Sequence, residues 1–265
     1  MAPVSGTCPR FPSERLPVPI THLLLDIEGT TCPVSFVGDV LFPYARQHLA
    51  SYLQAEADDP AVQKLVADLD QAWDADPNPH LQALRAQQRG QERADAVVPY
   101  LHWLIDHDIK ATALKDLQGR IWQAGYADGS IVAPLFPDVP AALQRWLEQG
   151  LVLAVYSSGS VAAQQLLYGH SQAGDLRHLF RHWFDTRTGA KQEASSYRWI
   201  TAAMGCAAAE VLFISDALAE LEAADAAGLQ VLFSDRFGNP ARDSGRFERI
   251  SDYSQLILND VTHRS

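Results

Sequence analysis

The chain has 265 residues and a hydrophobic content of 47%, which is enough for one or two domains with a sizeable core. Its formal net charge of −11 argues against nucleic acid or an anionic membrane as the main partner, and no apolar run is long enough for a transmembrane helix. Its 3 cysteines, Cys8, Cys32 and Cys206, are too few and too widely spaced for a disulfide framework or a zinc site, which favours a reducing, cytoplasmic location.

The chain is expected to begin with a flexible or extended leader over residues 1–19. This segment contains a density of prolines that excludes the interior of a helix or a sheet: Pro3, Pro9, Pro12, Pro17 and Pro19. No basic region followed by an apolar one is present, so no signal peptide is predicted. A buried parallel strand is predicted next, over residues 20–26, because an apolar run leads up to Asp26.

Two acidic residues follow this first strand, Asp26 at its end and Glu28 two positions later. In open α/β sheets, ligands bind at the carboxyl ends of the strands, which makes both residues candidates for chemistry. Asp26 can act as a nucleophile that carries a phosphoryl group, and two neighbouring carboxylates can bind Mg²⁺. Gly29 permits the tight turn that follows. An ordinary strand end with a turn remains an alternative at this point.

Residues 37–130 are predicted to be entirely helical. Apolar residues recur at helical spacing over residues 37–53, 65–73, 81–88, 97–105 and 112–123. Pro77, Pro79 and Pro99 are expected to separate these helices. The segment can be a lid over the first strand's loop or a helical domain without that role, and the sequence leaves both open.

An alternation of strands and helices resumes at Pro134. A helix over residues 138–149 and a strand over 151–156 lead to Ser157-Ser158-Gly159-Ser160, and a further helix is expected near Val161. Hydroxyls and N–H groups at such a helix start can bind an anion, although a serine N-cap is also common there.

The second half of the chain repeats this alternation. We predict strands at 180–186, 211–216 and 229–233, and helices at 193–204, 217–227 and, closing the chain, 251–259. The pattern predicts a parallel, doubly wound sheet. Lys191 lies in a loop and can offset phosphate charge, while Asp216 ends a strand. Glu220 can support the site or simply complement the dipole of its helix. Together with Asp26 and Ser157, these residues supply what phosphoryl transfer needs.

The order of these motifs resembles the haloacid dehalogenase superfamily, and within it the enolase-phosphatase (acireductone synthase) family of methionine salvage. The strings that carry the resemblance are Asp26-Ile27-Glu28-Gly29-Thr30-Thr31, Leu114-Lys115-x-Leu117-Gln118-Gly119 and Tyr156-Ser157-Ser158-Gly159-Ser160. The match runs from about Ile20 to the C-terminus. It implies a Rossmann-like α/β core over residues 20–36 and 131–265, with an all-helical cap domain inserted at 37–130.

The resemblance also implies a function. The expected substrate is 2,3-diketo-5-methylthiopentyl-1-phosphate, which is enolised and then dephosphorylated to the acireductone with one Mg²⁺ ion per subunit. The residues that match the family's metal ligands are Asp26, Glu28 and Asp216, with Asp26 and Glu28 also catalytic. Those that match its substrate-binding positions are Ser157, Ser158 and Lys191. Glu28 stands where most of the superfamily has Asp, so a standard aspartyl-phosphate mechanism is not assumed.

Other functions stay open from the sequence. A generic Mg²⁺-dependent phosphatase of another small phosphate ester is the main alternative, followed by a phospho-acceptor module that uses Asp26. A dehalogenase is less expected, because it would not need Asp216 as a ligand of Mg²⁺.

Many relatives have Arg-Pro-Gly-Asn where this chain has Arg236-Phe237-Gly238-Asn239, which leaves that loop's shape open. We expect a monomer with a small-molecule partner. The sequence does not identify the base for enolisation, for which Glu28 and a residue of the helical segment are both candidates.

Overall fold

The computed structural model describes residues 18–107, 109, 111–240, 242–256 and 258. The predicted leader lies outside the described residues, apart from its last two positions. The chain forms two compact units. The first, called the α/β unit below, is made of Met1–Phe36 and Val132–Ser265, and the second, the helical unit, is Val37–Ile131.

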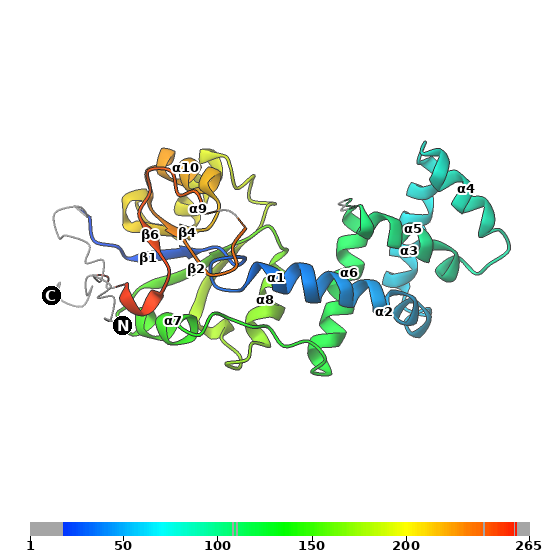
Figure 1. Ribbon diagram of the computed structural model, residues 1–265, viewed down its shortest axis with the longest axis horizontal. Coiled ribbons are helices and arrows are strands. Elements are labelled where there is room, and N and C mark those ends of the chain that lie inside the picture. Colours follow the sequence, from blue (N-terminus) through cyan, green and yellow to red (C-terminus); the bar gives the residue numbers. More distant parts are fainter. Residues whose placement is uncertain (1–17, 108, 110, 241, 257, 259–265) are drawn as a thin grey trace, which may run out of the picture. The chain divides into compact units, whose positions relative to one another are not determined.

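The α/β unit is built on a six-stranded sheet with the order β3-β2-β1-β4-β5-β6. All neighbouring strands run parallel, which confirms the predicted sheet (Figure 1). The strands are β1 His22–Leu25, β2 Val152–Tyr156, β3 Phe180–Phe184, β4 Val211–Ser215, β5 Gln230–Ser234 and β6 Arg249–Ile250. The short strand β6 was not expected from the sequence.

Helices cover both faces of this sheet. Figure 1 shows α9 and α10 on one face and α7 and α8 on the other. Their bounds are α7 Val139–Glu148, α8 Val161–Gly169, α9 Ala194–Met204 and α10 Leu218–Ala226. The short helical turns of the unit are α1 Val34–Phe36, η2 Arg177–Leu179, η3 Ala208–Glu210 and η4 Tyr253–Gln255. This is a doubly wound α/β fold, as predicted.

Strand β1 is the centre of the sheet and positions the site. It pairs with β2 on one side and β4 on the other, and Leu23, Leu24 and Leu25 are completely buried. Because Leu25 is in register with Ile214, the residues after β1 and β4 emerge side by side at the carboxyl edge. The order of the strands also reverses here, which is the place where open α/β sheets bind ligands.

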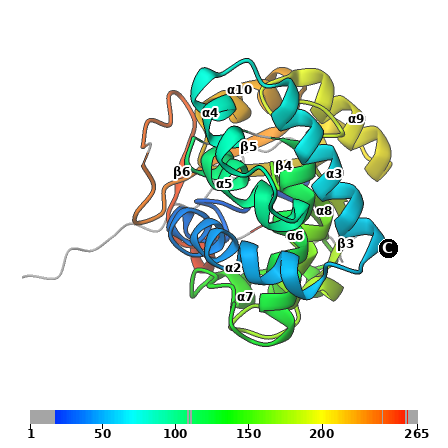
Figure 2. The same cartoon turned by 90° about the vertical axis from the view of Figure 1, so that its right-hand side faces the viewer.

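The helical unit contains no strand among its described residues, as predicted (Figure 2). Its elements are the π-helix η1 Val37–Leu41 and the α-helices α2 Phe42–Ala55, α3 Pro60–Ala75, α4 Pro79–Gln87, α5 Arg93–Asp106 and α6 Thr112–Ala127. Asp59 and Asn78 cap α3 and α4 by accepting backbone N–H bonds, each followed by a proline in the first turn. The unit has its own core, which includes Leu49, Trp73 and Leu101.

Two predicted details are wrong. Pro99 does not separate helices but lies inside α5, because Val97 and Leu101 on either side of it are fully buried and hold the helix together. The predicted closing helix over residues 251–259 is only the turn η4 in the described part. Its Tyr253 is drawn into the core, where the hydroxyl donates a hydrogen bond to the carbonyl of Thr30 at 3.1 Å.

Two further findings bear on the sequence-based expectations. Cys32, which is buried, and Cys206 are free thiols in the described part of the chain. None of the described helices combines the length and the apolar character that crossing a membrane requires.

Candidate active site

Asp26 stands at the carboxyl end of β1, where the sequence places it. Its backbone N–H donates to the carbonyl of Ile214 on β4 at 3.0 Å, so the chain is still held to the sheet at this position. The side chain is 5% exposed, and its Oδ1 accepts a hydrogen bond from the N–H of Ile27 at 2.8 Å. The carboxylate is therefore held at the edge of the sheet by the backbone of its own loop.

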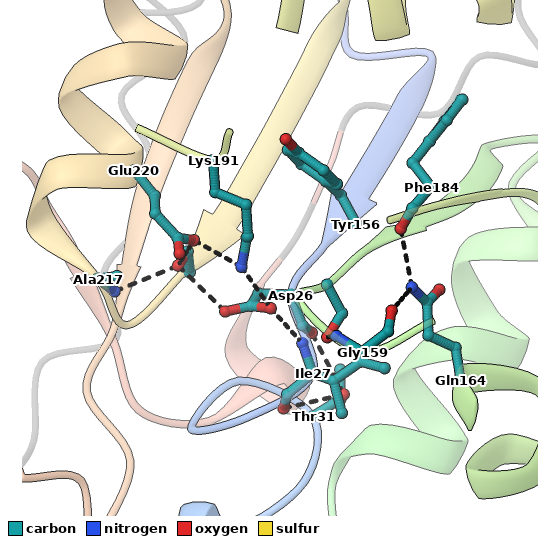
Figure 3. Close-up of polar contacts among 12 residues, drawn as sticks. Asp26, Ile27, Thr31, Tyr156, Gly159, Gln164, Phe184, Lys191, Ala217 and Glu220 are labelled. Atoms are coloured by element: carbon teal, nitrogen blue, oxygen red, sulfur yellow. Dashed lines mark hydrogen bonds and ion pairs between the residues drawn. The ribbon is translucent and has the colours of Figure 1, made fainter. Parts of the chain in front are cut away.

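Lys191 contacts this carboxylate directly (Figure 3). Its Nζ lies 2.8 Å from Asp26 Oδ1 and 2.7 Å from Glu220 Oε2. Lys191 is only 7% exposed. Burial disfavours the ammonium ion, but the attraction of the two carboxylates outweighs it and raises the pKa of Lys191. The lysine is thus a fixed positive charge beside Asp26.

The loop that carries Lys191 is held by hydrogen bonds from two tyrosine side chains to its backbone carbonyls. The hydroxyl of Tyr197 donates to the carbonyl of Lys191 at 2.7 Å, and that of Tyr156 donates to the carbonyl of Gly189 at 2.9 Å. Gly189 has a φ of +148°, and a β-carbon there would lie 2.2 Å from Ser196 Oγ. Two buried tyrosines and one glycine therefore fix a segment that looks like an ordinary polar loop in the sequence.

Glu220 completes the ion-pair cluster from α10. Its Oε2 also accepts a hydrogen bond from Ser215 Oγ at 2.9 Å, and Ser215 Oγ lies 3.4 Å from Asp26 Oδ2. Of the two roles that the sequence left open for Glu220, the structure supports the one in the site. Burial, followed by the nearby charge of Asp26, raises the pKa of Glu220 to about 7.

Asp216 follows β4 and turns toward the loop after β1. Its Oδ2 lies 2.1 Å from where a β-carbon of Gly29 would be, so only glycine leaves room for this carboxylate. Burial, and then repulsion from Asp26 and Glu220, raise the pKa of Asp216 to about 7. The site therefore holds an excess of buried negative charge, which a cation would neutralise.

The residues present fit a magnesium ion in part. Among the residues that the structure describes, no three acidic, histidine or cysteine side chains form a cluster able to hold a metal ion. Mg²⁺ at phosphoryl-transfer sites typically uses one or two carboxylates and completes its shell with water and substrate phosphate. Asp26 and Asp216, on neighbouring strands, suit that arrangement. Glu28 lies in the same loop with a partly exposed side chain, and its role as a ligand stays a prediction.

Ser157 and Ser158 follow β2, as predicted, but their environments differ. Ser157 is buried, and its Oγ accepts a hydrogen bond from the N–H of Gly159 at 3.4 Å, whereas Ser158 is exposed. Ser160 then caps α8, because its Oγ accepts a hydrogen bond from the N–H of Ala163 at 3.3 Å. The N-terminus of α8 therefore lies beside two serines, an arrangement suited to an anion such as phosphate.

Two residues whose role was not predicted from the sequence support the loop after β1. Arg236 is 3% exposed, and its Nε donates to the carbonyl of Thr30 at 3.3 Å. Asn239 Nδ2 donates to the carbonyl of Gly29 at 2.9 Å. Phe237 therefore lies between two anchored residues and is itself 96% exposed. The sequence string Arg236-Phe237-Gly238-Asn239 gives no local pattern from which these contacts could be predicted.

Comparisons with known proteins agree with this geometry. The family model for haloacid dehalogenase-like hydrolases matches residues 20–228. The chain is 50% identical over 244 residues to Enolase-phosphatase E1 of Parasynechococcus marenigrum, covering 91% of this chain and 98% of that protein. It is 51% identical over 248 residues to Enolase-phosphatase E1 of Synechococcus elongatus, covering 91% and 99%.

A solved structure is also similar along nearly the whole chain. The crystal structure of the UTR4 protein of Saccharomyces cerevisiae matches with a TM-score of 0.68 and 32% identity, covering 89% of this chain and 100% of that one. The family model, the curated relatives and the solved structure thus agree on the family and the fold of this chain. The chain belongs to the haloacid dehalogenase-like hydrolases and, within them, to the enolase-phosphatase family.

Proposed function

We propose that this protein is a bifunctional enolase-phosphatase of methionine salvage. It enolises 2,3-diketo-5-methylthiopentyl-1-phosphate and then removes the phosphate, giving the acireductone 1,2-dihydroxy-3-keto-5-methylthiopentene. The observation that carries the phosphatase half is the buried contact of Lys191 Nζ with Asp26 Oδ1 at 2.8 Å. The choice of substrate rests on the relatives named Enolase-phosphatase E1, which are about 50% identical over 91% of the chain.

The residues of the α/β unit divide the work of phosphoryl transfer among them. Lys191 brings a permanent positive charge to a buried position, where it stabilises the negative charge of a transferring phosphate more strongly than it would in water. Ser157 and Ser158, beside the start of α8, orient the phosphate oxygens. Asp26 is placed either to accept the phosphoryl group or to orient the attacking water, and both routes stay open.

Asp26, Glu28 and Asp216 are the proposed ligands of one Mg²⁺ ion. When bound, this ion would offset the phosphate charge and polarise the substrate oxygen at which an enolate develops. The close approach of the Asp216 carboxylate to the loop that follows Asp26 supports this placement, because neighbouring carboxylates are the oxygen ligands that Mg²⁺ takes at phosphoryl-transfer sites. Glu28 and a residue of the helical unit remain the candidate bases for enolisation. We further propose that the enzyme acts as a monomer in the cytoplasm.

The function is tested by incubating the protein with the diketo phosphate and Mg²⁺ while recording enol absorbance and released phosphate together. We expect enol to rise before phosphate, and both signals to disappear when the metal is chelated. Asp26→Asn should abolish phosphate release without unfolding the protein. Asp225→Asn, which alters an ion pair with Arg246 on the surface of α10, is the matched control and should retain full activity.

The outcomes separate the candidate functions. Phosphate release from generic esters, with no enol from the diketo phosphate, would leave a plain Mg²⁺-dependent phosphatase. Stable phosphorylation without turnover would favour a phospho-acceptor module instead.

A further inference from the structure

A buried glutamine on α8 connects the phosphate-binding loop to the neighbouring strand. Gln164 is 1% exposed, and its Nε2 donates one hydrogen bond to the carbonyl of Gly159 and one to the carbonyl of Phe184, each of 2.8 Å (Figure 3). Gly159 belongs to the loop after β2, and Phe184 ends β3. Neither bond belongs to the backbone pattern of the sheet or of the helix.

The orientation of this amide is fixed by its partners. Both partners are carbonyl oxygens, which only accept hydrogen bonds, so the nitrogen of the amide must face them. Gln164 Oε1 is left buried and without a hydrogen-bond partner among the described residues. Leaving an acceptor unpaired costs free energy, and such groups are rare in folded proteins.

The bond to Gly159 determines which way the next N–H group points. A trans peptide is planar, and its C=O and N–H point in opposite directions. Because the carbonyl of Gly159 faces Gln164 inside the protein, the N–H of Ser160 faces away from it. Ser160 is the residue at the start of α8, where backbone N–H groups and the helix dipole attract anions.

The second bond ties Gln164 to the strand residue that also holds the loop. The carbonyl of Phe184 also accepts the N–H of Ser157 at 3.2 Å, so Gln164 and Ser157 share one acceptor. Rotation of the loop would therefore break contacts at both Gly159 and Phe184. Gln164 does not need to touch the substrate to have this effect, since it acts through the backbone of the loop.

We propose that Gln164 is a positioning residue that fixes the Ser157–Ser160 loop in its phosphate-binding conformation. This inference rests on the proposed function, because it assumes that the loop binds the phosphate of the substrate. Gln164 lies outside the Ser157–Ser160 motif, but it aligns the backbone of that motif, and phosphate affinity depends on this alignment.

The chain offers a closely matched control in Gln230. Its Nε2 also donates to two backbone carbonyls, those of Val18 at 3.1 Å and Ala209 at 2.8 Å, and its Oε1 is likewise buried without a partner among the described residues. Gln230 begins β5 and therefore lies at the opposite edge of the sheet from the site. A purely structural role for such a glutamine should look the same at both positions.

The test compares Gln164→Met with Gln230→Met, since methionine has a similar length but cannot donate. Inorganic phosphate is the probe, and its dissociation constant is measured by calorimetry with Mg²⁺ present, at a temperature where circular dichroism shows both variants folded. We expect Gln164→Met to weaken phosphate binding about tenfold and to raise KM similarly, with kcat changed less. Gln230→Met should lower the melting temperature only. Equal stability losses with unchanged phosphate affinity in both variants would overturn the proposal.

A measurement on the unmodified protein covers the case in which Gln164→Met does not fold. The side-chain NH₂ resonances of Gln164 and Gln230 are followed by ¹⁵N NMR during titration with inorganic phosphate and Mg²⁺. The Gln164 signal should shift and the Gln230 signal should not, and a Gln164 signal that stays in place at saturation would refute the inference. A protein that binds phosphate but does not convert the diketo phosphate would contradict only the proposed function.

Discussion

Asp216 occupies the space that a side chain on Gly29 would need. The Asp216 Oδ2 atom lies 2.1 Å from the position of a Gly29 β-carbon, and Asn239 Nδ2 lies 2.9 Å from it. Gly29 also has a φ of +64°, which residues with a β-carbon rarely adopt. The glycine is therefore required both by the turn and by the close approach of a proposed metal ligand.

Gly29→Ala should damage the site more than the fold. The positive φ alone should lower the free energy of unfolding by about 1–2 kcal/mol. Displacement of Asp216 by the new methyl group should lower kcat about 100-fold, since a shift near 1 Å is enough for such a loss. Gly150→Ala is the control, because Gly150 has a φ of +81° but a β-carbon added there would meet no atom within 4 Å among the described residues. Steady-state kinetics and chemical denaturation of both variants check this. Equal kcat values in the two variants would argue against the steric explanation.

Glu220→Gln should slow phosphate release while the protein stays folded. The variant keeps the shape of the side chain but removes the negative charge that holds Lys191 Nζ at 2.7 Å. Lys191 would then be held by Asp26 alone. Because its ammonium group would be positioned less accurately, kcat should fall about 10- to 100-fold. Glu222→Gln, an exposed position on the same helix, should leave kcat unchanged. The comparison is made with the diketo phosphate at saturating Mg²⁺. A Glu220→Gln enzyme as fast as Glu222→Gln would limit Glu220 to a role in folding.

The sequence predicted the location of the site better than its internal contacts. Asp26 and Asp216 could be placed because each ends an apolar run, and parallel strands bring such ends to one edge. The partners of Glu220 could not be predicted, because a glutamate in the first turn of a helix also serves the helix dipole. Arg236 and Gln164 were missed for a related reason. Their bonds go to backbone carbonyls of segments far away or on another strand, and no local pattern records such contacts.

The histidines at the sheet should make stability depend on pH. Burial is the main cause that lowers the pKa of His22; the charge of Glu210 opposes this shift, and repulsion from His182 adds to it. Burial also lowers the pKa of His182. At each of these histidines the unfolded chain then binds more protons than the folded one below about pH 6.5, so the histidine contribution to stability is fully present above that pH and is lost as the pH falls.

Each histidine should therefore lower the free energy of unfolding as the pH falls from 7 to 5, by at most about 1.4 kcal/mol per pH unit, whereas Asp216 and Glu220, whose pKa values are raised to about 7, act in the opposite direction. Urea denaturation at several pH values measures this slope. His22→Gln and His182→Gln should each make the free energy of unfolding fall less, or rise more, as the pH is lowered, because each removes one group that the folded state keeps neutral. Slopes identical to that of the unmodified protein would show that other groups control the acid sensitivity.

Arg236→Lys should destabilise the α/β unit although it preserves the charge. The Arg236 guanidinium donates to the carbonyls of Thr30 at 3.3 Å and Ser251 at 2.7 Å and to Asp138 Oδ1 at 3.0 Å. It also lies 4.0 Å from the centre of the Tyr253 ring. A lysine ammonium cannot reproduce this planar arrangement, and the lost bonds should cost about 2–3 kcal/mol of unfolding free energy.

The matched control for this prediction is Arg242→Lys. Arg242 Nη2 lies 2.6 Å from Asp235 Oδ1, but its side chain is 58% exposed. Exposed ion pairs of this kind contribute about 1 kcal/mol or less, so this variant should unfold almost as the natural protein does. Thermal and chemical denaturation of both variants measure the difference. A loss of stability as large for Arg242→Lys as for Arg236→Lys would mean that the buried hydrogen bonds to Thr30 and Ser251 contribute no more to stability than an exposed ion pair does.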